Sequence, residues 1–277
     1  MIGLSIDDRA VGHDLPMEPT PLLFHHAQFD ATALAEDRGP LRISVCIPAR
    51  NEAPTVGAVV RCVHRRLTAA GGGVDLVDEI VVVDDGSTDT TATEARRAGA
   101  VVVPSGGGQG KGQAMAAGVA ATSGDLVVFL DADVESFADH FVTGLLGPLL
   151  LHPHVVLVKA FYHRPLNGSP VGGGRVTELV ARPVIELLFP PLTHIRQPLA
   201  GETALRRVVL ADAVLDPGYG VELGLLIDVA ERHGVSALAQ VDLDRRVHRN
   251  RPLEELRPQA TDVLRAALTR AGAVVAD

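Results

Sequence analysis

Two acidic residues directly follow a strongly apolar run in the middle of the chain. Residues 126–130 are rich in β-branched and aromatic side chains, and Asp131-Ala132-Asp133 comes next. Such a run is typical of a fully buried strand, and the chain after a strand of an open α/β sheet reaches the edge where ligands bind. Carboxylate oxygens at that edge suit Mg²⁺ or Mn²⁺ carrying a diphosphate. The first hypothesis is therefore a metal-dependent enzyme acting on a nucleotide diphosphate compound.

A glycine-rich segment, residues 105–112, precedes this strand. A Walker A loop requires Gly where Ser105 stands and Ser or Thr where Gly112 stands, so the phosphate-loop interpretation fails. The segment still delivers Lys111 to the start of a helix predicted over residues 113–121. A lysine there could pair with a phosphate or with the two aspartates, and a solvated surface lysine is the alternative.

A second glycine-rich segment, residues 167–178, predicts a flexible loop that opens into a helix. Backbone amides at that helix start, beside Arg175 and Thr177, could bind an anionic second substrate. A mobile linker explains the composition equally well. Further on, Glu222 begins an apolar helix, where an acid often only complements the helix dipole.

Histidines offer further candidates for a metal site. His248 follows the last predicted strand and could complete the metal shell begun by Asp133, although a single histidine is more often a surface or core residue. The adjacent His25 and His26 could also be ligands. Neighbouring residues point in different directions on a helix or strand, so packing of an entry segment is favoured for this pair.

Alternating strands and helices must position these residues. Strands are predicted over residues 43–47, 79–83, 100–103, 126–130, 155–161 and 235–241, and helices over 31–38, 56–67, 90–98 and 113–121. A broken helix is expected over 140–151, and Pro258 is expected to interrupt a helical tail. The alternation predicts an α/β fold with a doubly wound, mostly parallel sheet flanked by helices.

Composition narrows the classes of protein. The chain has 277 residues, 47% of them hydrophobic, which is ample for a sizeable core. The net charge of −9 argues against broad nucleic-acid binding. No run approaches the roughly 18 apolar residues of a membrane span, and the acidic N-terminus lacks a leader pattern. Cys46 and Cys62 have no metal-ligand spacing and are expected in the core. We expect a cytoplasmic protein without nucleic-acid or membrane partners.

Four motifs in order resemble nucleotide-sugar-dependent glycosyltransferases of the GT-A fold. They are PARNE at 48–52, VDDGSTD at 83–89, GKG at 110–112 and DAD at 131–133. The second half resembles the retaining glucosyl-3-phosphoglycerate synthases and their mannosyl relatives. This likeness rests on GGGRVTELVARP at 172–183, QPLAGE at 197–202, GYGVE at 218–222 and HRNRPL at 248–253.

The resemblance implies a role for each candidate residue. The nucleotide sugar would be contacted by Pro48, Ala49, Arg50, Glu52, Asp85, Lys111, Asp131, Tyr219 and Glu222, and the catalytic set would be Glu222, Lys111 and Asp131. Asp133 and His248 would hold Mg²⁺ or Mn²⁺. The phosphoglycerate would be received by Gly174, Arg175, Thr177 and Asn250.

The implied function is retaining transfer of a hexose, with UDP-glucose favoured, to the 2-hydroxyl of 3-phosphoglycerate. The alternatives are GDP-mannose as donor, an inverting GT-A transferase with a polyprenyl-phosphate or saccharide acceptor, and a non-catalytic nucleotide-sugar-binding protein. The expected organisation is an N-terminal arm and short helix (1–40), one GT-A domain (41–252) and a C-terminal helical tail (253–277). Within the domain, 41–135 would bind the nucleotide sugar and 136–252 the acceptor. A homodimer is also expected.

Overall fold

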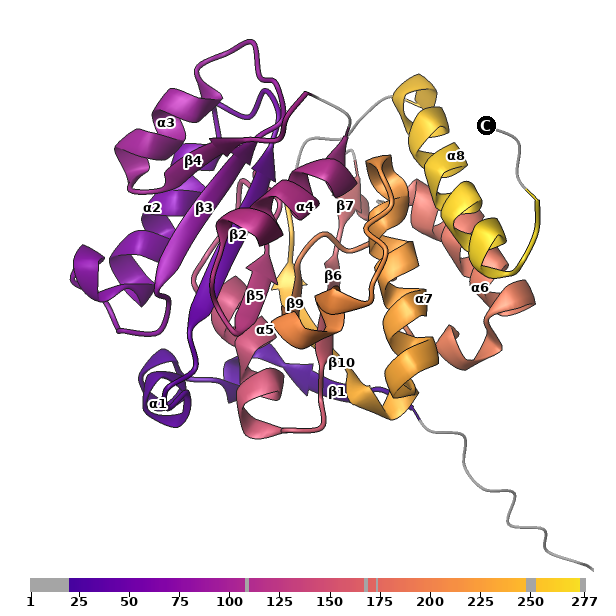
Figure 1. Cartoon of the computed structure of the whole chain (residues 1–277), viewed down its shortest axis with the longest axis horizontal. Helices are drawn as coiled ribbons and strands as arrows, with labels where there is room; N and C mark the ends of the chain where they lie inside the picture. Colours follow the sequence, from indigo (N-terminus) through magenta and orange to yellow (C-terminus); the bar gives the residue numbers. More distant parts are fainter. Residues whose placement is uncertain (1–19, 108–109, 167–168, 173, 248–252, 275–277) are drawn as a thin grey trace, which may run out of the picture.

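The computed structural model describes residues 20–107, 110–166, 169–172, 174–247 and 253–274. Within these residues a sheet of eight strands crosses the molecule in the order β1-β10-β6-β9-β5-β2-β3-β4 (Figure 1). The strands are β1 (Leu22–His25), β2 (Ile43–Ala49), β3 (Glu79–Asp84), β4 (Val101–Pro104), β5 (Leu126–Phe129), β6 (Leu157–His163), β9 (Thr203–Arg206) and β10 (Leu238–Arg245).

Neighbouring strands pair in parallel except at β9, which is antiparallel to both β5 and β6. The prediction of a doubly wound, mostly parallel sheet is confirmed. In the register of β2 with β3, Ala49 lies opposite Asp84, so the two strands end at the same edge of the sheet. The loops after them therefore begin side by side, as a ligand site at the strand ends requires.

Helices cover both faces of the sheet and enclose two hydrophobic cores. One core contains side chains of α1 (Ala31–Asp37), α2 (Val56–Leu67), α3 (Thr91–Ala98) and α5 (His140–Leu151). The other contains side chains of α4 (Lys111–Ala121), α6 (Arg182–Leu188), α7 (Val221–His233) and α8 (Leu253–Arg270). Alternate residues of β5 serve the two cores, Leu126 and Val128 on one face and Val127 and Phe129 on the other.

Several expectations about single elements are wrong. Helix α5 is continuous through Pro148, because the lost hydrogen bond is outweighed by the burial of every residue from 141 to 149. Helix α8 likewise continues through Pro258. The glycine-rich segment expected as a loop contributes to a two-stranded hairpin of β7 (Pro165–Leu166) and β8 (Ser169–Gly172). Strands β1 and β9 lie where no strand was predicted.

The length and hydropathy of each helix show whether it could span a membrane. Of the helices that the structure describes, none has both the length and the apolar character that crossing a bilayer requires.

Candidate active site

A cavity of about 300 Å³ opens at the carboxyl ends of the central strands. It brings together residues that are far apart in the sequence. Thirteen predicted site residues line it: Pro48, Ala49, Arg50, Glu52, Asp85, Lys111, Asp131, Asp133, Gly174, Arg175, Thr177, Tyr219 and Glu222. The other two, His248 and Asn250, lie outside the described residues.

The folding of the chain explains this convergence. Pro48 and Ala49 end β2, Asp85 follows β3, and Asp131 and Asp133 follow β5, so the parallel strands deliver them to one edge. Lys111 is the first residue of α4 and enters the cavity from the facing helix layer.

Lys111 lies between two carboxylates. Its Nζ is 2.5 Å from Oδ1 of Asp131 and 2.7 Å from Oε1 of Glu222. Burial alone would lower the pKa of Lys111, but the two carboxylates outweigh it and raise the pKa well above its ordinary value. Burial would raise the pKa of Asp131, but Lys111 and then Arg246 lower it. The site therefore holds the Lys111 ammonium between the side chains of Asp131 and Glu222.

Arg246 is a central residue that the sequence analysis missed. Its guanidinium is 3% exposed and donates to Oδ2 of Asp131 at 2.6 Å, Oδ1 of Asp133 at 3.0 Å and Oε1 of Glu202 at 2.8 Å. Tyr162 donates its hydroxyl to the other oxygen of Glu202 at 2.6 Å. Arg246 thus fixes both aspartates of the DAD motif against a buried acid. The available signal was its position just after the last strand, but that strand was expected to end at residue 241.

Another part of the cavity lining, here called the basic wall, contains arginines. Arg175 lines it together with Arg164, which the sequence analysis also missed. Arg164 donates to the Tyr162 hydroxyl at 2.8 Å, and its Nη1 lies 3.5 Å from the point that a Cβ on Gly174 would occupy. Gly174 adopts a φ of +81°, which favours glycine. Two arginines beside a helix start make this wall suitable for a small anion.

The acidic wall has the donor atoms that a hard divalent cation prefers. Asp131 and Asp133 both line the cavity, and Arg246 occupies only one of the two carboxylate oxygens of Asp133. Carboxylate oxygens with room for additional oxygen ligands suit Mg²⁺ or Mn²⁺. The described residues therefore fit the predicted metal at Asp133, and its predicted partner His248 lies outside them.

Further lining residues had been given no role from the sequence. Leu199 lies in the 197–202 turn, and Leu256, Gln259 and Val263 lie on α8. Leucine and valine in a helical pattern carry no chemical signal, so their place in the cavity depends on how α8 packs. This fold, with acids and arginines lining one cavity at the strand ends, fits an enzyme that uses a metal-carried nucleotide donor and an anionic acceptor.

Comparison with known proteins agrees with this class. The model of the glycosyl transferase family 2 matches residues 44–198. Glucosyl-3-phosphoglycerate synthase of Mycobacterium tuberculosis (strain CDC 1551 / Oshkosh) is 43% identical over 272 residues, which cover 93% of this chain and 81% of that protein. The synthase of Petrotoga mobilis (strain DSM 10674 / SJ95) is 40% identical, over 89% of this chain and 79% of that protein.

Solved structures agree as well. The Mycobacterium tuberculosis synthase in complex with Mn²⁺, uridine-diphosphate-glucose and phosphoglyceric acid matches with a TM-score of 0.83 and 41% identity, over 93% of this chain and 89% of that chain. Its complex with Mg²⁺ and uridine-diphosphate gives 0.83 and 41%, over 92% and 88%. The chain belongs to glycosyl transferase family 2 and, within it, to the glucosyl-3-phosphoglycerate synthase family.

Proposed function

We propose that this enzyme transfers glucose from UDP-glucose to the 2-hydroxyl of 3-phosphoglycerate, with retention of configuration at the anomeric carbon. One observation supports it most: a single cavity is lined by Asp131, Asp133 and Glu222, which we assign to the donor, and by Arg164 and Arg175, which we assign to the acceptor. Relatives over 40% identical carry the name of this activity. An arginine wall in a chain of net charge −9 indicates a small, multiply charged acceptor.

The donor would be bound by residues from several segments of the chain that line the cavity. Pro48, Ala49, Arg50, Glu52 and Asp85 would contact the nucleoside. Bound Mg²⁺ or Mn²⁺, held by Asp133 with His248, would neutralise the charge that develops on the departing diphosphate. Lys111 and Asp131 would orient the ribose and diphosphate, since Arg246 and Glu222 fix both side chains before the donor enters.

Glu222 bears on the choice between two retaining mechanisms. In one a protein carboxylate attacks the sugar first, and in the other the acceptor hydroxyl attacks it directly. It is buried, and its carboxylate is paired with the Lys111 ammonium at 2.7 Å. A paired carboxylate is a weaker nucleophile, so we assign Glu222 to the hydroxyls of the glucose. The acceptor hydroxyl would then attack the same face that the diphosphate leaves, and the leaving phosphate would receive the proton.

The acceptor would lie on the basic wall. Gly174, Arg175 and Thr177 belong to one segment at a helix start, and Arg164 faces the same cavity. Their charges and backbone amides would hold the phosphate and carboxylate, which leaves the 2-hydroxyl toward the donor. Asn250 belongs to the predicted acceptor set and lies outside the described residues.

The division of labour along the chain is also part of this proposal. Residues 41–135 supply the nucleotide side and 136–252 the acceptor side, with residues 1–40 as an arm and short helix. The tail, 253–277, contributes α8, whose Leu256, Gln259 and Val263 line the same cavity. We propose the cytoplasm as the location of the enzyme.

A donor panel tests the activity. The protein with Mn²⁺ or Mg²⁺ is incubated with UDP-glucose, GDP-mannose or other nucleotide sugars, with and without 3-phosphoglycerate, and release of nucleoside diphosphate is followed. UDP-glucose should give the fastest acceptor-dependent release, and Asp133→Asn should abolish it. The exposed Asp212→Asn is the matched control and should keep full activity. A lack of release with every donor would overturn the proposal.

A further inference from the structure

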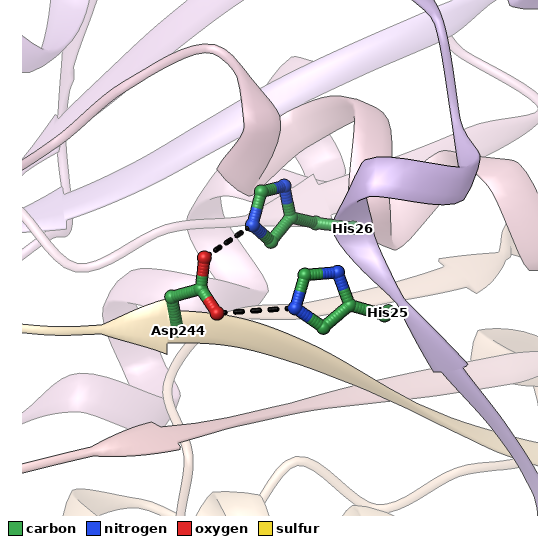
Figure 2. A group of neighbouring side chains, drawn as sticks. All are labelled: His25, His26 and Asp244. Atoms are coloured by element: carbon green, nitrogen blue, oxygen red, sulfur yellow. Dashed lines mark hydrogen bonds and ion pairs between the residues drawn. The ribbon is translucent and has the colours of Figure 1, made fainter.

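Two histidines and an aspartate meet where the parallel strands β1 and β10 end, and they lie outside the cavity. His25 is the last residue of β1, His26 begins a short 3-10 turn (His26–Gln28), and Asp244 lies near the end of β10. None of the three lines the active-site cavity. Figure 2 shows both imidazole rings directed at the Asp244 carboxylate.

The expectation that the two histidines point apart is wrong. The chain turns between His25 and His26 as it passes from β1 into the 3-10 turn, so the ring centroids are only 4.5 Å apart. The His140 ring packs on the His26 ring, with 4.2 Å between centroids. Contacts from α5, through His140, and from β10, through Asp244, therefore hold the two histidines in place.

The potential ligand atoms are close to the spacing that a metal ion requires. His25 Nε2 is 3.1 Å from Oδ1 of Asp244, and His26 Nε2 is 2.7 Å from Oδ2. Ligand atoms of the three residues all lie within 4.8 Å of one another, and no other group of three metal-binding side chains in the described part of the chain does so. Ligands 2.0–2.1 Å from a tetrahedral ion are about 3.3 Å apart, so the side chains would have to draw together by about 1.5 Å at most.

We infer that His25, His26 and Asp244 form a second metal site, selective for a zinc-class transition metal and distinct from the catalytic Mg²⁺ or Mn²⁺ site. Two imidazoles and one carboxylate suit Zn²⁺, whereas the hard ions of the catalytic site prefer oxygen ligands. The side chains of His25 and Asp244 are 46% and 61% exposed, so solvent reaches the site and can complete the coordination.

Binding requires a change of tautomer. The backbone N–H of Ala27 donates to Nδ1 of His25 at 3.2 Å, so the proton of this ring is on Nε2 and is donated to Asp244. When the ion takes the Nε2 lone pair, that proton moves to Nδ1 and the bond from Ala27 is lost.

The site would join β1 to the end of β10, the strand that Arg246 directly follows. β1 pairs with β10 in parallel, with His25 opposite Asp242, and Arg246 follows Asp244 by two residues. A bound ion would therefore brace the edge strand β1 and the end of β10. It should raise the thermal midpoint of the protein as any ligand of the native state does.

Zinc titration tests the inference. Full-length protein freed of metal with a chelator is titrated with ZnCl₂ in excess Mg²⁺, which occupies the catalytic site, and binding is followed by calorimetry. One equivalent should bind. His25→Asn, His26→Asn and Asp244→Asn should each weaken binding at least tenfold and remove the zinc-dependent rise in thermal midpoint. Asp244 has a φ of +63°, a conformation that asparagine tolerates, so Asp244→Asn should fold.

Two controls separate this site from others. The exposed His233→Asn and the catalytic-site Asp133→Asn should both keep full zinc affinity. CoCl₂ bound to the unaltered protein should give the visible absorption of a low-coordinate site with nitrogen ligands, a result that requires no variant. The inference is overturned if the native protein binds no zinc in excess Mg²⁺. It is also overturned if the three variants bind zinc as the native protein does.

Discussion

Arg175 is a single residue whose role in selecting the acceptor can be measured. It lines the cavity beside Gly174 and Thr177. Arg175→Ala should raise the KM for 3-phosphoglycerate by tenfold or more, because a charge-assisted contact to an anion is lost, and should change the KM for UDP-glucose little. Steady-state kinetics with each substrate varied in turn provide the measurement.

The control for Arg175 is Arg182→Ala. Arg182 begins α6 on the same segment, pairs with Glu178 at 3.1 Å and does not line the cavity. Its replacement should leave both KM values near native. Equal increases in both KM values for Arg175→Ala would remove this residue from the acceptor site.

Arg246 should matter for stability as well as for activity. Its removal leaves Glu202, which is fully buried, without its cationic partner. Arg246→Met should lower the free energy of unfolding by roughly 3–5 kcal/mol, the usual cost of breaking a buried ion pair on one side. Arg97→Met, at a side chain 70% exposed, should change it by less than about 1 kcal/mol. Urea denaturation measures both, and equal midpoints for the two variants would contradict this role.

Lys159 gives a prediction for pH dependence. It is buried on β6, donates to the Ala200 carbonyl and the Thr203 hydroxyl, and burial lowers its pKa to about 8 from 10.5. Between pH 8 and 10.5 the unfolded chain keeps this proton while the native state loses it, so stability from this group rises with pH. Relative to Lys159→Met, the native protein should gain roughly 2 kcal/mol from pH 7 to pH 10. A pH-independent difference between the two proteins would show that Lys159 does not titrate in this range.

At the scale of elements, the turn at residues 197–202 supports the DAD motif. A Cβ on Gly201 would lie 2.2 Å from Oδ1 of Asp131, so the absence of a side chain lets this turn pack against the carboxylate. Gly201→Ala should therefore displace Asp131 and reduce kcat/KM at least tenfold, which steady-state kinetics would detect.

Gly57→Ala on α2 is the matched control for Gly201. The nearest atom to its Cβ would be the flexible guanidinium of Arg61, which can move. Helix propensity favours this substitution by up to about 1 kcal/mol, so activity should stay native and stability should not fall. Full activity in Gly201→Ala would show that Asp131 does not need its present position.

The periodicity of apolar residues predicted the regular helices and strands well. It failed where tertiary contacts determine whether a strand forms or a helix continues. Helix α2 and strand β3 lie within a residue of their predicted bounds, because each has a clean apolar pattern. Strand β9 has only four residues, and its antiparallel place between β5 and β6 depends on partners that are distant in sequence. Helices α5 and α8 continue through a proline because packing stabilises them, which a local rule does not capture.

The site residues were likewise predicted where they belong to a sequence motif and missed where they do not. Residues in motifs, such as Asp131 and Lys111, were predicted and line the cavity. Arg246 and Arg164 were not, because an isolated arginine near a strand end has no local signature. Glu202 and Tyr162, which hold Arg246 in place, were missed for the same reason: their buried network exists only once β6 and β10 lie side by side.

For the molecule as a whole, the sheet separates two cores while its strand ends carry one cavity shared by both halves of the chain. Acids and arginines in one cavity would bring a metal-carried donor and an anionic acceptor together. The homodimer stays a prediction.

The configuration of the product tests the central claim most directly. NMR of the product formed from UDP-glucose and 3-phosphoglycerate reports both the linkage and the anomer. We predict an α-glucosyl bond to the 2-hydroxyl of phosphoglycerate, because the acceptor attacks the face that the diphosphate leaves while Glu222 stays paired with Lys111. A β-linked product, or no product with this pair of substrates, would contradict the account.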